Sequence, residues 1–132
     1  MQTSELIENV TGFEFSRMGY MLGSLQIKME LKNGVRTVRT ESMMHFSDCG
    51  NGEKTVNEEE WNAFFEKLFS EFGVMKLKRK YKIDGIIMDG EYWSLSVKFA
   101  NRRAKNSEGE SVYPECWDEL AEVIQRFAKI DN

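Results

Sequence analysis

Four lysines alternate along one segment of the chain, separated by apolar residues and one arginine. On a β-strand this alternation places the lysines on one face, about 6.6–7 Å apart, which is near the phosphate repeat of a nucleic-acid strand. A tyrosine among cations offers a ring on which a base can stack, and further cations follow in a polar segment. The candidate binding surface comprises Lys76, Lys78, Lys80, Lys82, Tyr92, Arg102, Arg103 and Lys105.

The same lysines have a second interpretation. Lysines along an exposed strand discourage edge-to-edge pairing between sheets. The formal net charge of -4 favours this interpretation, because nucleic-acid-binding proteins are more often basic. We therefore expect protection of a sheet edge ahead of nucleic-acid binding.

His45 is the single histidine, and it stands four residues before Cys49. Nucleophilic catalysis pairs a nucleophile with a base, so these two residues are the simplest catalytic pair that the sequence offers. The segment 47–52 has the composition of a loop, and an unsupported loop rarely holds catalytic geometry. We expect a histidine at a strand end and a loop thiol, and we assign no catalytic residue.

Asp84, Asp89 and Glu91 could surround one turn and offer oxygen ligands to Ca²⁺ or Mg²⁺. Their spacing does not match an EF-hand loop, and tight turns commonly need aspartate before glycine. The glycines stand singly, without the lysine and hydroxyl residue of a phosphate-binding loop. We therefore predict no metal, no cofactor and no enzymatic activity.

Cys49 and Cys116 are the two cysteines, and their spacing makes neither a disulfide framework nor a metal motif. Free thiols indicate a cytoplasmic protein. The first residues lack the basic and apolar regions of a secretory signal, and no stretch has the roughly 18–20 apolar residues that span a bilayer. We expect one domain over residues 1–132 and no contact with a membrane.

The clearest predicted element is a helix over residues 58–72. Its apolar residues recur every three or four positions, which is typical of one buried helical face. Asn57 can cap the first turn together with Glu60. Gly73 stands where a helix end favours a left-handed residue.

A second helix is predicted from about Pro114 to Lys129. Proline suits a first turn, where its missing N–H needs no partner. The acidic residues of the first turns interact favourably with the helix dipole. We interpret them as a solvated face rather than as an acidic docking face.

Asn33-Gly34 predicts a β-hairpin, because both residues tolerate positive φ. Residues 25–31 alternate between apolar and polar types, and the return strand covers 35–44. A two-residue turn pairs Met29 with Val38 and Ile27 with Thr40. An earlier strand at 13–17 joins this meander.

The second half of the chain repeats strands and then a helix. Strands are predicted at 77–83 and 93–99, with turns at Asp84-Gly85 and Asp89-Gly90 and a loop or short strand at 102–111. The fold class is α+β: an antiparallel sheet of about six strands with two helices on one face. The halves 10–73 and 74–130 suggest a duplicated βββα unit.

Methionine is abundant, with eight residues in the chain. Met43 and Met44 are adjacent, so on a strand they face opposite sides and one of them is expected to be exposed. Flexible thioethers suit adaptable binding surfaces, although filling a core is their commoner role.

The last third of the chain resembles a pattern in small uncharacterised bacterial proteins, where DG-x-x-W-x-L-x-I precedes Y-P-x-x-W-x-x-L. The matching residues here are Asp89, Gly90, Trp93, Leu95 and Val97, then Tyr113, Pro114, Trp117 and Leu120. The segment 108–111 departs from the pattern, which has a Ser-Gly-containing turn there. The resemblance implies a strand anchored by tryptophan and covered by a helix, and it implies no activity.

These observations predict a small non-enzymatic binding protein, an inhibitor, immunity or regulatory partner of another protein. One alternative is a phage-encoded inhibitor of a nuclease, of the anti-CRISPR type. Another is a nucleic-acid-binding module that uses the lysine segment 76–82. A small enzyme using His45 and Cys49 is the least favoured.

Overall fold

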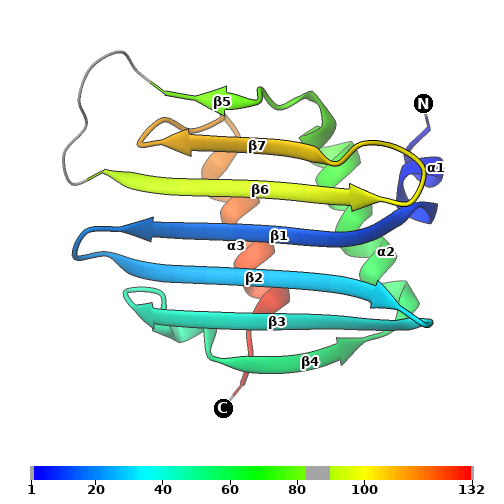
Figure 1. Ribbon diagram of the computed structural model, residues 1–132, viewed down its shortest axis with the longest axis horizontal. Helices are drawn as coiled ribbons and strands as arrows, with labels where there is room; N and C mark the ends of the chain where they lie inside the picture. Colours follow the sequence, from blue (N-terminus) through cyan, green and yellow to red (C-terminus); the bar gives the residue numbers. More distant parts are fainter. Residues whose placement is uncertain (1, 83–89, 132) are drawn as a thin grey trace.

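The computed structural model describes residues 2–82 and 90–131, and it has an α+β fold (Figure 1). Its strands are β1 (Val10–Gly19), β2 (Gly23–Lys32), β3 (Val35–Met44), β4 (Gly52–Val56), β5 (Lys80–Tyr81), β6 (Glu91–Phe99) and β7 (Lys105–Glu110). Its helices are α1 (Thr3–Glu8), α2 (Glu58–Glu66) and α3 (Trp117–Ala128).

The seven strands form one sheet in the order β4-β3-β2-β1-β6-β7-β5. Neighbouring strands are antiparallel, except that β5 runs parallel to β7. Helices α2 and α3 lie on one face of the sheet and run across its strands, as predicted (Figure 1). Among the described residues no helix lies on the other face.

The β2–β3 hairpin confirms the predicted turn and register. Asn33 and Gly34 have φ of 52° and 77°, the left-handed values that a two-residue turn of this kind needs. Met29 lies opposite Val38, and Ile27 lies opposite Thr40.

Helix α2 begins with the predicted capping box. The Glu60 N–H donates to the Asn57 side chain at 2.8 Å, and the Asn57 N–H donates to the Glu60 carboxylate at 3.1 Å. The helix continues as a π-helical turn, Lys67–Glu71, and Gly73 follows with φ of 58°. Its buried face packs on the sheet, where Phe13 meets the rings of Phe64 and Phe65 edge-on.

Helix α3 begins three residues later than predicted. The Trp117 N–H donates to the Pro114 carbonyl, so Pro114 lies in a turn before the helix rather than in its first turn. The Trp117 ring then packs against Phe15 and Trp93 of the sheet. At the other end of α3, the buried Thr40 hydroxyl donates to the Ala128 carbonyl at 2.7 Å.

The sheet shows no duplicated βββα unit. In the first half of the chain, sheet order follows chain order from β1 to β4. In the second half, the first strand, β5, lies at the sheet edge, and it runs parallel to the last strand, β7. The similar strand sequences therefore reflect two strands with the same buried pattern.

Three further elements differ from the expectations. The strand predicted over 77–83 is reduced to Lys80–Tyr81, and β7 is a regular strand, Lys105–Glu110. Strand β4 and helix α1 were not predicted. The turns predicted at Asp84-Gly85 and at Asp89 lie outside the described residues. Within the described ranges, no helix is both long and apolar enough to cross a membrane.

Candidate protein-docking surface

The lysine segment does not form the continuous strand that its alternation suggested. Lys76 ends a 3-10 turn, Lys78 lies in the next loop, and Lys80 alone of the four is on a strand. The Lys78 N–H donates to the Tyr81 hydroxyl, which bends the chain back on itself before β5. The lysines therefore do not have the regular spacing that would match the phosphates of a nucleic-acid strand.

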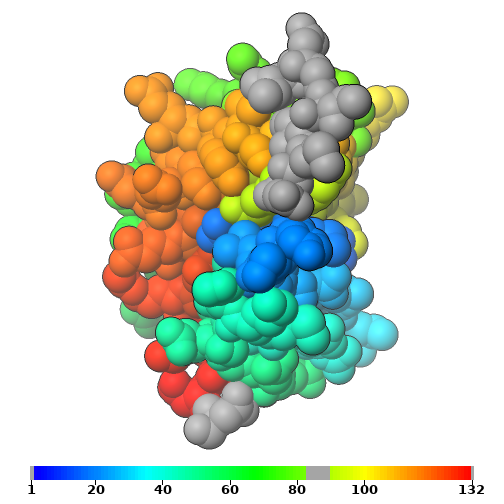
Figure 2. All heavy atoms as spheres, turned by 90° about the vertical axis from the view of Figure 1, so that its left-hand side faces the viewer, coloured from blue at the N-terminus to red at the C-terminus, as the bar shows by residue number. Residues whose placement is uncertain are grey.

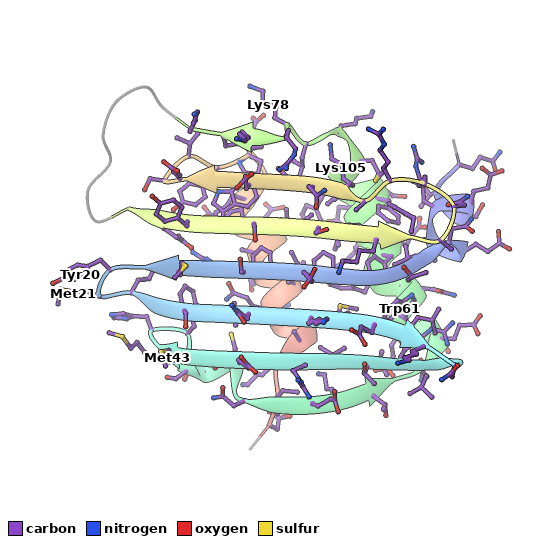
Figure 3. All side chains as sticks on the ribbon, in the orientation of Figure 1. Tyr20, Met21, Met43, Trp61, Lys78 and Lys105 are labelled. Carbon is purple, nitrogen blue, oxygen red and sulfur yellow. The ribbon has the colours of Figure 1, made fainter. Side chains whose placement is uncertain are left out.

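The remaining residues of the predicted binding surface lie far apart. Tyr92 is near the start of β6, whereas Arg102 and Arg103 follow its end at Phe99. Seven residues of strand between Tyr92 and Phe99 span about 23 Å. The Lys105 ammonium donates to the Leu77 carbonyl and so holds the segment before β5 against β7. Figure 3 shows Lys78 and Lys105 at that edge of the sheet.

The helix-free face of the sheet has mixed charge. Lys98 pairs with Glu14 at 2.9 Å, Lys28 pairs with Glu30 at 3.2 Å, and Arg39 approaches Glu53 at 3.8 Å. These pairs are exposed and contribute little stability. They neutralise three of the cations on this face, and a surface of such mixed charge is a poor match for a polyanion.

The Cys49 side chain is buried rather than displayed on a loop. Burial raises the pKa of the Cys49 thiol, and the neighbouring Asp48 carboxylate raises it further, against smaller opposite effects of Arg17 and Lys129. A catalytic cysteine needs a lowered pKa, because the thiolate is the nucleophile. Burial raises the Cys116 pKa as well.

Glu91 is the described member of the predicted metal cluster, and it is engaged elsewhere. Its carboxylate accepts hydrogen bonds from Arg17 and from the Tyr113 hydroxyl. In the part of the chain that the structure describes, no group of three or more histidine, cysteine or acidic side chains could hold a metal ion.

One end of the sheet gathers large apolar side chains in solvent. Six residues there are 52% to 73% exposed. We call this set the methionine–tyrosine end; it consists of Met18, Tyr20, Met21, Met43, Met44 and Tyr92. Figure 3 shows Tyr20, Met21 and Met43 projecting from this end, and Figure 2 views the molecule from the same side.

Strand register brings these residues together from three strands and one turn. Met43 lies opposite Ser24, Ser24 lies opposite Met18, and Met18 lies opposite Tyr92. Because neighbouring strands are about 4.8 Å apart, this row is roughly 14 Å long. Tyr20 and Met21 form the turn between β1 and β2 and extend beyond the middle of the row.

Two of the methionines have left-handed backbone conformations. Met21 has φ of 63° and Met44 has φ of 59°. For a residue with a Cβ this conformation costs about 1–2 kcal/mol, and glycine avoids the cost. The two turns are joined, since the His45 N–H donates to the Leu22 carbonyl at 3.1 Å. Folding alone would favour glycine at Met21 and Met44, so the exposed thioethers need another explanation.

A partly buried polar network lies beneath these strand ends. Arg17 donates through Nε and Nη2 to the Glu91 carboxylate, the latter at 2.9 Å, and through Nη1 to the Gln125 amide oxygen at 2.8 Å. Its guanidinium carbon lies 4.9 Å from the Phe46 ring centroid and 5.2 Å from that of Trp117. Arg17 precedes Met18 and Glu91 precedes Tyr92, so the network holds both strand ends in place.

Tyr113 completes this network. Its hydroxyl donates to Glu91 Oε1 at 2.8 Å. Burial, and then the hydrogen bond to the Glu91 carboxylate, raise the pKa of Tyr113 to about 12. The phenol therefore stays protonated and keeps donating over the physiological pH range.

A hollow of about 220 Å³ opens beside Met18 and Tyr92, between β6 and the β5 edge. Its floor includes Ser16 and Ser94, whose hydroxyl oxygens are 2.6 Å apart. Lys80, Lys82 and Glu110 also line it.

Sequence reasoning identified part of this surface. It expected one of Met43 and Met44 to be exposed, and both are exposed because Met44 ends β3 in a left-handed conformation. It placed Tyr92 in a cationic surface, and Tyr92 does line the hollow together with Lys80 and Lys82, while its neighbours on the adjacent strands are Met18 and Glu110. The exposed Met18, Tyr20 and Met21 were missed. The one sequence feature that pointed to exposed methionines at Met18 and Met21 was the abundance of this residue type.

No protein-family model, curated protein or solved structure matches this chain.

Proposed function

We propose that this chain is a small non-enzymatic binding module that acts on another protein, as an inhibitor, immunity or regulatory partner. The observation that carries the proposal is the methionine–tyrosine end: six large apolar side chains, each more than half exposed, gathered by strand register at one end of the sheet. Large contiguous apolar patches on soluble domains usually mark interaction sites.

The residue types at this end suit protein recognition. Protein interfaces are enriched in tyrosine and methionine and depleted in lysine and glutamate at their centres. Unbranched thioethers can adjust to the shape of a partner surface. Tyr20 and Tyr92 add rigid aromatic area with a polar tip.

The left-handed methionines support the same conclusion. Backbone strain in a folded protein persists where a function needs it. Met21 and Met44 place exposed side chains at positions where glycine would stabilise the fold. The polar network of Arg17 and Glu91 beneath them supplies a rigid base, which lowers the entropic cost of binding.

The alternatives have less support. A nuclease inhibitor belongs to the proposed class, since it would act by covering a protein. Binding of nucleic acid through the lysine segment is not favoured, because Lys76, Lys78 and Lys80 lie on three different elements. An enzyme using His45 and Cys49 is not favoured, because the pKa of the Cys49 thiol is raised. The two free thiols are compatible with a cytoplasmic protein.

The test is a comparison of matched variants in affinity capture after nuclease treatment. Tyr20→Ser/Met21→Ser removes the centre of the methionine–tyrosine end. Val35→Ser is the control, because Val35 is 49% exposed at the opposite end of β3. We expect one partner to bind the wild type and the control in stoichiometric amounts and to be lost with the double variant. A partner retained equally by all three proteins would refute the proposal.

A further inference from the structure

The methionines of this protein fall into two groups. Six of the eight lie among the described residues. Met29 is 1% exposed in the core, and Met75 packs against the core and is partly buried. The other four are 58% to 70% exposed and all belong to the methionine–tyrosine end; we call them the exposed methionines, and they are Met18, Met21, Met43 and Met44. One end of the sheet therefore holds all the freely accessible thioethers of the described residues.

Exposure is what a thioether needs in order to react with a peroxide, because its sulfur is nucleophilic without losing a proton. The sulfur lone pair attacks one peroxide oxygen, so an S–O bond forms as the O–O bond breaks. With hydrogen peroxide, the second oxygen takes up the proton of the transferred hydroxyl and leaves as water. The sulfur is oxidised by two electrons to a sulfoxide, and the peroxide is reduced by the same two electrons.

The two cysteines compete poorly for the same oxidant. Cys49 is buried and Cys116 is half-buried, and burial raises the pKa of both thiols. Because the thiolate is the reactive form of cysteine, little of either residue is ready to react at neutral pH. Among the described residues, the sulfur atoms that a peroxide in solution reaches first are therefore those of the exposed methionines.

Oxidation at these positions changes the surface and spares the core. A sulfoxide is polar, whereas the thioether that it replaces is apolar. On an exposed side chain the new oxygen is hydrated, so the fold loses little stability. In an interface the same oxygen is buried, and where no donor meets it we expect binding to weaken about tenfold for each sulfoxide.

We propose that the methionine–tyrosine end is an oxidation site, at which a peroxide converts the exposed methionines to sulfoxides and thereby stops binding of the partner while the fold persists. The effect on binding rests on the proposed function, since it needs a partner at this surface. The reaction at the methionines does not rest on it, because it depends only on where the thioethers lie.

Hydrogen peroxide added to the purified chain tests the reaction itself. Mass spectrometry of peptides sampled over time gives a rate for each methionine, and fragmentation separates Met43 from Met44. We expect each exposed methionine to react at least about tenfold faster than Met29, which reacts only when the core opens locally. Met75 should react at an intermediate rate, and the far-ultraviolet circular dichroism should not change. If Met29 kept pace with the exposed methionines, or if the fold were lost as they reacted, the proposal would be overturned.

Retention on a phenyl chromatography matrix tests the change of surface. The wild type should be retained less after peroxide treatment. Met75→Leu is the matched control, because it removes a methionine outside this end, and it should lose retention as the wild type does. Replacing all four exposed methionines with leucine keeps apolar side chains that peroxide does not oxidise, so peroxide should not change the retention of that variant from its own untreated value. A loss of retention in the leucine variant equal to that of the wild type would refute the site.

A second variant reproduces the oxidised surface without any oxidant. Met21→Gln/Met43→Gln places polar side chains of similar length at two exposed positions, where the fold requires no apolar contact. Its retention on the phenyl matrix should fall below that of the untreated wild type. Unchanged retention would show that the polarity of these side chains does not control the surface.

Reversal and partner capture complete the experiment. Methionine sulfoxide reductases for both sulfoxide epimers, supplied with dithiothreitol, should restore the untreated retention. In that reduction the sulfoxide oxygen leaves as water, and the two thiols of the reductant form a disulfide. A partner captured by the untreated chain should be lost after peroxide and recovered after reduction.

The two proposals fail separately. If a captured partner is lost with Tyr20→Ser/Met21→Ser but still binds the fully oxidised chain, the oxidation switch is refuted and the proposed function stands. If the exposed methionines react selectively and retention falls, but no captured protein depends on Tyr20 and Met21, the oxidation site stands and the proposed function is refuted.

Discussion

Arg17 and Glu91 form a two-point ion pair on the helix side of the sheet, beneath the strand ends that display Met18 and Tyr92 on the other side. The Arg17 side chain is 17% exposed and the Glu91 side chain is 10% exposed. Gly19 of β1 lies opposite Glu91 of β6, so the pair crosses the β1–β6 boundary diagonally. The pair therefore ties two sequence-distant strand ends into one rigid edge.

We expect Arg17→Leu to lower the free energy of unfolding by about 2–4 kcal/mol, because it leaves the Glu91 carboxylate buried without its cation. Urea denaturation gives the value. Lys98→Gln is the matched control: Lys98 also pairs across β1 and β6, with Glu14, but that pair is about half exposed and should be worth less than about 1 kcal/mol. Equal losses for the two variants would show that the Arg17 network does not support the strand ends.

The raised pKa of Tyr113 predicts that the folded protein loses stability at alkaline pH. Its pKa is about 12 in the folded protein and about 10 in the unfolded chain. The unfolded chain therefore releases the proton first, and the stabilisation from Tyr113, complete below pH 10, is lost as the pH rises from 10 to 12. The stability difference between the wild type and Tyr113→Phe, measured by urea denaturation, should shrink over that range. If the stability difference stayed constant over this pH range, the Tyr113 hydroxyl would be hydrogen-bonded to water rather than to the Glu91 carboxylate.

The Cys49 thiol should react slowly in the folded protein. Because its pKa is raised and its side chain is buried, little thiolate is accessible at pH 8. Alkylation by iodoacetamide, followed by mass spectrometry of each peptide, should be slower at Cys49 than at the half-buried Cys116, and slower at both than in urea. Faster alkylation of Cys49 in the folded protein than in urea would indicate an activated thiol and would favour the enzymatic alternative.

Gly109 has no room for a side chain. A Cβ there would lie 2.5 Å from the Val112 carbonyl oxygen. It would lie still closer to the Trp93 indole nitrogen, which donates a hydrogen bond to that oxygen. Gly109→Ala should therefore destabilise the fold by about 3 kcal/mol, through overpacking under β7.

Gly34→Ala is the control for the Gly109 variant. Gly34 has φ of 77° but no neighbouring atom within 4 Å of an added Cβ, so the strained backbone alone should cost about 1 kcal/mol. Thermal or urea unfolding compares the two variants. If Gly34→Ala were the more damaging, the contact of Gly109 with Trp93 would not constrain the fold.

The parts of the fold that sequence predicted are those that local interactions determine. Asn33-Gly34 specifies its own turn, and a two-residue turn then sets the register of β2 against β3. Asn57 and Glu60 cap α2 through groups three residues apart. Such signals need no knowledge of what packs against them.

The lysine segment shows where a local pattern misleads. Its alternation is typical of a strand, yet the Tyr81 hydroxyl accepts the Lys78 N–H and the Ser107 hydroxyl donates to the Lys78 carbonyl. These side-chain contacts replace the ladder that the pattern implied. Pro114 is similar: its residue type suits a first helical turn, yet it precedes α3, where its carbonyl accepts the Trp117 N–H.

The sequence by itself determined the α+β class, the β2–β3 hairpin and the capped start of α2, since these depend on residues close together in the chain. Only the tertiary structure decided that Met18 meets Tyr92, because the two lie 74 residues apart and become neighbours through the β1–β6 pairing. That pairing is set by burial of Phe13, Phe15 and Leu95 against the helices. The exposed methionine–tyrosine end is thus a consequence of how the core packs on the opposite side of the same strands.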